Sequence, residues 1–210
     1  MSVDLVIPAR CNPLAVARTE ALVFQFAAGT WPEHLARLQR LGFRGAIVGG
    51  QGCGKTTLLG ELPDRLRGLG VGSLAVRAAR RGGTRRRELA AWLRTLQPAD
   101  VLLLDSAEQL RRIDWWWLVR QTRVQRLGIV VTVHRRCCLP TWLECRPSTG
   151  MLADLLADLG LDRQAHAAVF RRADVLYNRH RGNVREVFRS LYDEIAVGPL
   201  GRLAAPTRPS

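Results

Sequence analysis

The most constraining feature of this sequence is a glycine-rich segment, residues 49–57, which reads GGQGCGKTT. It fits the pattern Gly-x-x-x-x-Gly-Lys-Ser/Thr. An apolar run of strand length precedes it at residues 43–48, and leucines at helical spacing follow it at residues 58–69. A strand, a glycine loop and a helix in this order form a phosphate-binding loop, in which backbone N–H groups and the helix N-terminus face phosphate oxygens. The sequence therefore predicts an α/β fold with a parallel sheet and a site for a nucleoside triphosphate.

The loop contains Lys55, the only lysine among the 32 basic side chains of the chain. Arginine bias of this kind is typical of a GC-rich genome, and a lysine left at random among the basic positions would fall here about one time in thirty. Its compact ammonium group reaches between phosphates inside a tight backbone cradle, whereas a planar guanidinium is wider. We expect the nucleotide, ATP, to be bound by Gly49, Gly50, Gln51, Gly52, Cys53, Gly54, Lys55, Thr56 and Thr57.

A second apolar run, residues 100–105, predicts a buried parallel strand that ends at Asp105. A carboxylate at the carboxyl end of such a strand is the usual partner of a phosphate loop. We expect Mg²⁺ to be held by the hydroxyl of Thr56 and, through a water molecule, by Asp105.

Candidate catalytic groups follow this strand and the next one. Glu108 lies three residues after Asp105, in the first turn of a helix that we expect over residues 108–126. It is either a general base or an ordinary acid at a helix N-terminus. The next buried strand, residues 127–134, places Thr132 and His134 on the same side if alternation holds. We favour Thr132 as the residue that faces the γ-phosphate, and we interpret His134 as a loop or core histidine.

The order of these motifs resembles that of the AAA+ P-loop ATPases, and the resemblance covers residues 12–196. The stretch RGNVRE at residues 181–186 is similar to part of the AAA+ helical lid, which implies that Arg185 reaches the γ-phosphate; a surface arginine in a helical hairpin is the alternative. Asn12 and Pro13, before a short helix near residues 32–41, resemble the AAA+ ATPases that assist DNA transposition and secretion.

One departure from the family pattern concerns hydrolysis. Hydrolysing AAA+ proteins usually carry a glutamate directly after the aspartate, but this chain has Ser106 there. The stretch between His134 and Met151 is also short for a module that carries a trans-acting arginine finger. The resemblance thus implies nucleotide binding more firmly than hydrolysis or ring assembly.

We predict four parts along the chain. Residues 1–42 form an N-terminal extension that packs on the core, residues 43–147 the P-loop α/β core, residues 148–197 a small helical lid, and residues 198–210 a flexible tail. Three consecutive tryptophans at residues 115–117 cannot share one helical face. We expect two rings to pack in the core, and at least one to be exposed or covered by the N-terminal extension or a partner.

The net charge of +14 indicates a polyanionic partner such as nucleic acid, unless it reflects genome composition alone. No apolar run approaches the roughly 18 residues of a membrane helix, and the N-terminus lacks a signal-peptide pattern, so we expect a cytoplasmic protein without membrane contact. The five cysteines do not suggest a disulfide framework, and the spacing of Cys137, Cys138 and Cys145 does not match a zinc site.

Three functions remain open from the sequence. The first is an ATP-binding protein that acts as a slow Mg²⁺-dependent ATPase or a nucleotide switch with a protein or DNA partner. The second is a small-molecule or nucleotide kinase, in which arginines between residues 77 and 87 bind an acceptor phosphate. The third is a nucleic-acid-binding protein in which the nucleotide has a structural role.

Overall fold

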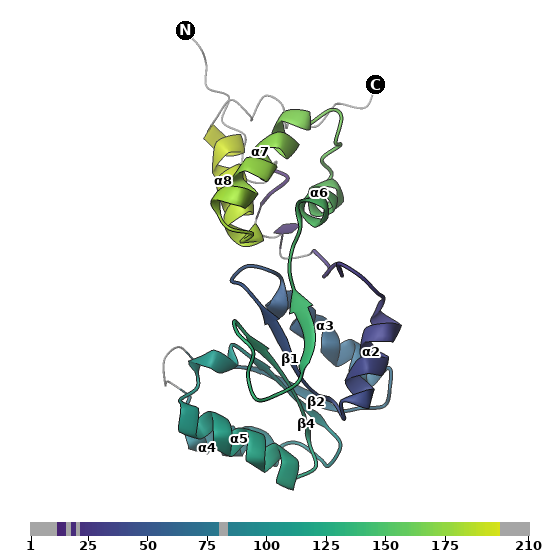
Figure 1. The fold of residues 1–210 in the computed structure, drawn as a ribbon, viewed down its shortest axis with the longest axis vertical. Helices are drawn as coiled ribbons and strands as arrows, with labels where there is room; N and C mark the ends of the chain where they lie inside the picture. Colours follow the sequence, from purple (N-terminus) through teal and green to yellow (C-terminus); the bar gives the residue numbers. More distant parts are fainter. Residues whose placement is uncertain (1–11, 16–17, 20–21, 80–83, 198–210) are drawn as a thin grey trace. The chain divides into compact units, whose positions relative to one another are not determined.

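The computed structural model describes residues 12–15, 18–19, 22–79 and 84–197. The chain forms two compact units (Figure 1). The sheet unit contains residues 28–50 and 54–145. The helical unit contains the described residues before 28 and after 145, and the loop residues 51–53 group with it. The sequence-based boundaries at residues 42, 147 and 197 remain predictions.

The sheet unit is built on five parallel strands in the order β2-β3-β4-β1-β5. These strands are β1 (Arg44–Gly49), β2 (Ser73–Arg77), β3 (Val101–Asp105), β4 (Gly128–Val133) and β5 (Thr141–Cys145). Because all five run in the same direction, their carboxyl ends meet at one edge of the sheet. The segments that follow β1, β3 and β4 therefore lie close together, although they are far apart in sequence.

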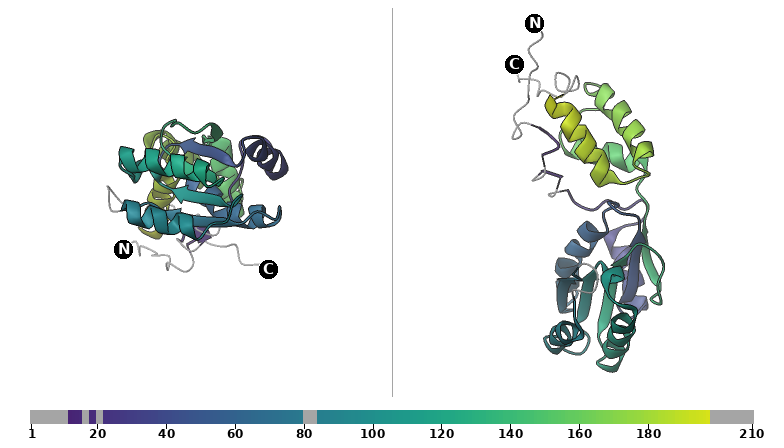
Figure 2. Two further views of the ribbon diagram at one scale, coloured as in Figure 1. Left: turned by 90° about the horizontal axis from the view of Figure 1, so that it is seen from below. Right: turned by 90° about the vertical axis from the view of Figure 1, so that its left-hand side faces the viewer.

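Helices cover both faces of this sheet, as Figures 1 and 2 show. They are α2 (Trp31–Arg40), α3 (Lys55–Arg67), α4 (Arg86–Arg94) and α5 (Arg112–Val124), with a 3₁₀ turn, η2 (Ala107–Gln109), before α5. Helix α3 contacts four of the strands, and α4 and α5 pack on the opposite face through Leu89, Leu93 and Leu118. Every residue of β3 and β4 is buried, which explains why both strands read as continuous apolar runs. The predicted α/β class with a parallel sheet is confirmed.

Two local predictions differ from the structure. The single helix expected over residues 108–126 is divided into η2 and α5, because Leu110 and Arg111 have extended backbone angles, with ψ of 147° and 145°. Strand β5 was not expected. It is a short edge strand that buries only Trp142 and Cys145, so its apolar pattern is weak.

The tryptophan prediction is confirmed. Trp115 and Trp117 are half-buried and pack against the sheet core, whereas the ring of Trp116 is exposed.

The helical unit contains α6 (Thr149–Asp158), α7 (Ala167–Arg179) and α8 (Val184–Val197) around an apolar core of its own. The N-terminal segment joins this core through Leu14. Asn12 is fully buried; its side chain accepts a hydrogen bond from the backbone N–H of Leu14 (3.0 Å) and donates one to the carbonyl of Tyr192 (3.2 Å). The Asn-Pro element thus anchors the segment before the sheet unit to the helical unit. None of the described helices is long and apolar enough to span a bilayer.

Candidate functional site

The glycine loop connects the carboxyl end of β1 to the first turn of α3. Gly52 and Gly54 have φ angles of 70° and 89°, in the left-handed region that side chains disfavour, so glycine is required at both positions. Among the described residues, no side chain caps the N-terminus of α3, and its first turn contains no acidic residue. The partial positive charge of this helix end is therefore left for an external anion, as a phosphate site requires.

Lys55 lies at the first position of α3 and is largely buried, with 8% of its surface exposed. Its Nζ donates hydrogen bonds to the carbonyl oxygens of Gly49 (2.9 Å) and Gly50 (2.5 Å). The ammonium group is thus held inside the loop by backbone dipoles, at the place where the sequence motif predicts contact with phosphates.

The carboxylate of Asp105 is the centre of a hydrogen-bonded cluster at the same edge. Thr56 Oγ1 lies 3.2 Å from both carboxylate oxygens, and Thr132 Oγ1 donates to Oδ1 at 2.6 Å. Arg77 Nε donates to Oδ2 at 2.8 Å. Side chains from three different segments therefore converge on one largely buried carboxylate.

Glu108 is brought to this edge by a sharp turn after β3. Ser106 has a φ of 61° and a ψ of 46°, and its backbone N–H donates to Thr132 Oγ1 at 2.7 Å. The chain then enters η2, which contains Glu108. Glu108 Oε1 lies 3.1 Å from His134 Nε2, so the carboxylate interacts with the residue that follows β4.

His134 connects Glu108 to the phosphate loop. Its other ring nitrogen, Nδ1, lies 3.5 Å from Lys55 Nζ and 3.3 Å from the carbonyl oxygen of Gly49. Lys55 and Glu108 thus contact opposite sides of one imidazole ring. This arrangement gives His134 a definite place in the candidate site, which its sequence context did not indicate.

The sheet unit therefore gathers Lys55, Thr56, Asp105, Glu108 and Thr132. Arg185 lies in the first turn of α8, in the helical unit, and its approach to a nucleotide remains a prediction. Sequence reasoning did not place Arg77 beside Asp105, and it favoured Thr132 over His134 as the polar residue that faces the γ-phosphate. The structure places Arg77 there because it is the last residue of β2 and pairs in register with Asp105, the last residue of β3.

The donor set fits Mg²⁺ that is bound together with a nucleotide. The ion prefers oxygen ligands and is usually held by one or two protein groups plus phosphates and water. Thr56 and Asp105 supply a hydroxyl and a carboxylate 3.2 Å apart. Within the described residues, no three His, Cys, Asp or Glu side chains form a cluster that could hold a metal. The phosphates of a bound nucleotide would have to complete the coordination.

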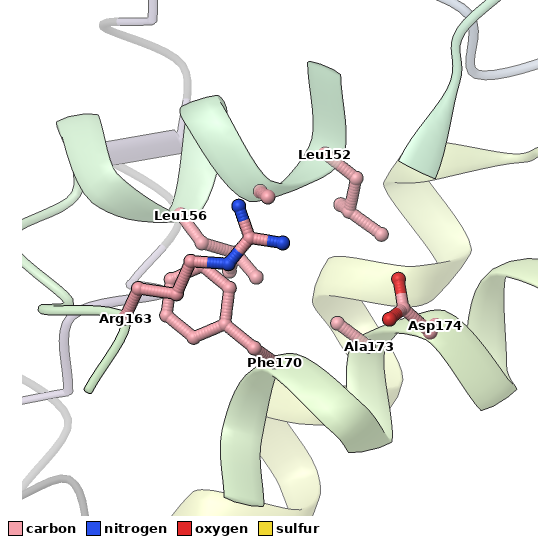
Figure 3. A pocket seen from close by; sticks show the side chains of 7 residues that line it. Leu152, Leu156, Arg163, Phe170, Ala173 and Asp174 are labelled. Carbon is pink, nitrogen blue, oxygen red and sulfur yellow. The ribbon is translucent and has the colours of Figure 1, made fainter. Parts of the chain in front are cut away.

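A separate hollow lies in the helical unit between α6 and α7 (Figure 3). The guanidinium of Arg163 lies 5.9 Å from the centre of the Phe170 ring and partly covers the hollow. The space that it encloses is only about 10 Å³, far below the roughly 300 Å³ at which small-molecule sites begin. We interpret it as a packing gap beside the three-helix core.

The strand order, the phosphate loop and the strand that ends at Asp105 together define a P-loop NTPase fold. The chain is similar to RuvB from Thermotoga maritima, an AAA+ P-loop ATPase. One point mutant of RuvB matches with a TM-score of 0.52 and 16% identity, over 79% of this chain and 62% of that chain. At this identity the similarity shows the fold alone, and the chain spans less than two thirds of that RuvB structure.

Two further RuvB mutant structures have TM-scores of 0.48 and 0.45, each at 12% identity. They cover 78% and 84% of this chain and 67% and 72% of their own. No protein-family model and no curated protein matches the sequence.

Proposed function

We propose that this chain binds ATP with Mg²⁺ and acts as a nucleotide switch or slow ATPase together with a protein or nucleic-acid partner. The observation that carries the proposal is the convergence of Lys55, Thr56 and Asp105 at the carboxyl edge of the sheet, beside an uncapped helix N-terminus. A phosphate loop offers four groups to a metal-bound triphosphate: a buried cation, a hydroxyl, a carboxylate and the N-terminus of a helix.

Each group has a distinct role in this proposal. Lys55 exchanges its carbonyl partners in the loop for phosphate oxygens, and backbone N–H groups between Gly50 and Thr57 bind the remaining oxygens. Thr56 and Asp105 would hold Mg²⁺, which neutralises phosphate charge when it is bound. Arg185, carried over from the resemblance to the AAA+ lid, contacts the γ-phosphate.

For hydrolysis, Glu108 is the proposed general base. Its carboxylate is partly exposed and has His134 at 3.1 Å, which orients it at the edge where the γ-phosphate would lie. The hydroxyl of Thr132 donates a hydrogen bond to Asp105, so the proposal assigns Thr132 to the orientation of that carboxylate. Because Glu108 does not directly follow the strand, we expect slow turnover.

The partner and cellular role belong to the same proposal. The chain is strongly basic, with a net charge of +14, which favours an acidic protein or a nucleic acid as partner. Its Asn-Pro element and single P-loop core favour the group of ATPases that assist DNA transposition or secretion, acting in the cytoplasm. The arginines on which the kinase alternative rests differ in this structure: Arg77 pairs with Asp105, whereas Arg87 is exposed.

Nucleotide titration tests the binding step. Isothermal titration with ATP and Mg²⁺ should show saturable binding of ATP to the wild type. The affinity of the variant Lys55→Ala for ATP should be lower by about tenfold or more. Arg67→Ala is the matched control, because Arg67 is exposed in the last turn of the same helix and pairs only locally with Asp64. Equal affinities for the wild type and Lys55→Ala would rule out the site.

A steady-state assay tests the catalytic assignment. Glu108→Gln should lower ATP turnover by about 10²-fold or more without a large change in ATP affinity, because a general base acts in the reaction and not in binding. The control is Asp64→Asn, which removes an exposed carboxylate on α3. Turnover that is unchanged in Glu108→Gln would remove Glu108 as the base.

A further inference from the structure

The outward face of helix α5 combines apolar and basic side chains. Ile113, Trp116 and Val124 are 60%, 58% and 68% exposed. Arg112, Arg120 and Arg123 are exposed beside them. At 100° per residue, these six residues lie within an arc of about 120° along the helix. They form one continuous stripe, which we call the α5 face.

The α5 face carries positive charge that no acid of the same helix compensates. The one acidic residue of the helix, Asp114, is buried and pairs with Arg86 of α4 at 3.4 Å. All residues of α5 are described, and those at its exposed positions are either arginine or apolar. A surface of this kind attracts a partner that supplies both carboxylates and apolar side chains.

The helix is fixed in this orientation by its opposite side. Leu118, Val119 and Thr122 are buried against the sheet, and Arg44 donates hydrogen bonds to the carbonyl of Val119 (3.3 Å) and the hydroxyl of Thr122 (3.1 Å). Rotation of α5 to bury Ile113 or Trp116 would expose these groups. The apolar part of the α5 face can therefore leave water only when another molecule covers it.

We propose that the α5 face binds an acidic amphipathic helix of a partner protein. Ile113, Trp116, Arg120 and Arg123 follow the three- and four-residue spacing at which one helix presents a ridge to another. Arg120 lies in the middle of this stripe, so a helix packed on it must place a carboxylate opposite the guanidinium. Trp116 is the kind of large aromatic anchor that contributes most to such contacts. This inference is independent of the nucleotide site.

Other occupants fit the α5 face less well. A second copy of the chain would bring three arginines against three, in a molecule of net charge +14. The terminal segments 1–11 and 198–210 contain one acidic side chain between them, Asp4. Nucleic acid would use the arginines, but its phosphates gain nothing from Ile113 and Val124.

Peptide display tests the proposal with a random library as the probe. A phage library of random peptides of about four helical turns is selected on the wild type and depleted on the variant Ile113→Ser/Trp116→Ser/Val124→Ser. We expect enrichment of acidic peptides with apolar residues three and four apart. Enrichment of neutral or basic peptides would overturn the proposal. It would also be overturned if no enriched peptide bound the wild type better than the triple variant.

Charge exchange then tests the role of Arg120. Arg120→Glu should weaken binding of a selected peptide by about tenfold or more, and replacing the facing glutamate of the peptide by lysine should restore it. Val175→Ser, an exposed change on α7, is the matched control and should leave affinity unchanged.

Two further measurements address the competing occupants. Binding of duplex or single-stranded DNA that is weakened by Ile113→Ser as strongly as by Arg120→Glu would contradict the proposal. Self-association of the wild type that the triple variant abolishes would contradict it as well. Circular dichroism of each variant verifies the fold, which exposed substitutions should leave intact.

Discussion

Arg77 Nε donates a hydrogen bond to Asp105 Oδ2 over 2.8 Å, and the two residues face each other in register at the carboxyl ends of β2 and β3. The arginine side chain is 68% exposed, whereas that of the aspartate is 9% exposed. A largely solvated cation thus neutralises the carboxylate that would face Mg²⁺ in the proposed nucleotide complex. The two cations compete for the same oxygens.

The first prediction follows from this competition. Arg77→Gln should lower the Mg²⁺ concentration needed for half-maximal ATP binding several-fold, since the metal no longer displaces a guanidinium. Without Mg²⁺, the free energy of unfolding of the variant should be at most about 1 kcal/mol below that of the wild type, because Arg77 is largely solvated. Thermal shift over a Mg²⁺ series measures both effects. Arg87→Gln, at an exposed position of α4, should change neither, and an unchanged Mg²⁺ dependence in Arg77→Gln would contradict the competition.

The second prediction concerns the buried hydroxyl of Thr132. Thr132→Val keeps the shape but removes the donor to Asp105 and the acceptor for the N–H of Ser106. Because both partners are left without this bond, the free energy of unfolding should fall by about 1–3 kcal/mol. Urea denaturation measures it. Thr95→Val, on the surface after α4, should cost no more than about 0.5 kcal/mol; equal losses in the two variants would argue against the cluster.

The third prediction tests the turn that redirects the chain after β3. Ser106 has a φ of 61°, where a Cβ atom is strained. Ser106→Gly should therefore be more stable than Ser106→Ala by about 1 kcal/mol. The difference comes from paired urea unfolding curves. An alanine variant as stable as the glycine variant would mean that the turn is not held in the left-handed region in solution.

The fourth prediction concerns thiol reactivity. Burial raises the pKa of the Cys137 thiol, whereas Cys138 is exposed. A raised pKa lowers the thiolate fraction at a given pH, so Cys137 should be alkylated more slowly, and its rate should keep rising above the ordinary thiol pKa of about 8.5. Iodoacetamide labelling of Cys137→Ser and Cys138→Ser, followed by mass spectrometry across pH, compares the two sites. Equal rates for both would contradict the burial of Cys137.

Several parts of the fold and site could be predicted from the sequence because their signals are local. The glycine spacing around Lys55, the apolar run before Asp105 and the run that ends near His134 each lie within one short segment. Parallel strands buried on both faces need continuous apolar residues, and a phosphate loop needs glycines where φ is positive. Strands β1, β3 and β4 and the start of α3 could therefore be recognised from the sequence alone.

The remaining features depend on which strands become neighbours. Arg77 reaches Asp105 across 28 residues of sequence, and Lys55 lies beside His134 across 79. Strand β5 follows the same rule, since it is recognisable only through its pairing with β1. No local pattern encodes such contacts, because they arise from the order and register of the sheet.

Local patterns in the sequence were sufficient to identify a phosphate loop in a parallel α/β fold, because backbone geometry and burial act within single segments. Three relationships became visible only in the folded chain: Arg77 pairs with Asp105, His134 lies between Lys55 and Glu108, and Trp116 lies on an exposed basic face of α5. These relationships follow from parallel strands whose carboxyl ends meet at one edge, and from a helix whose buried side determines which side is left in water.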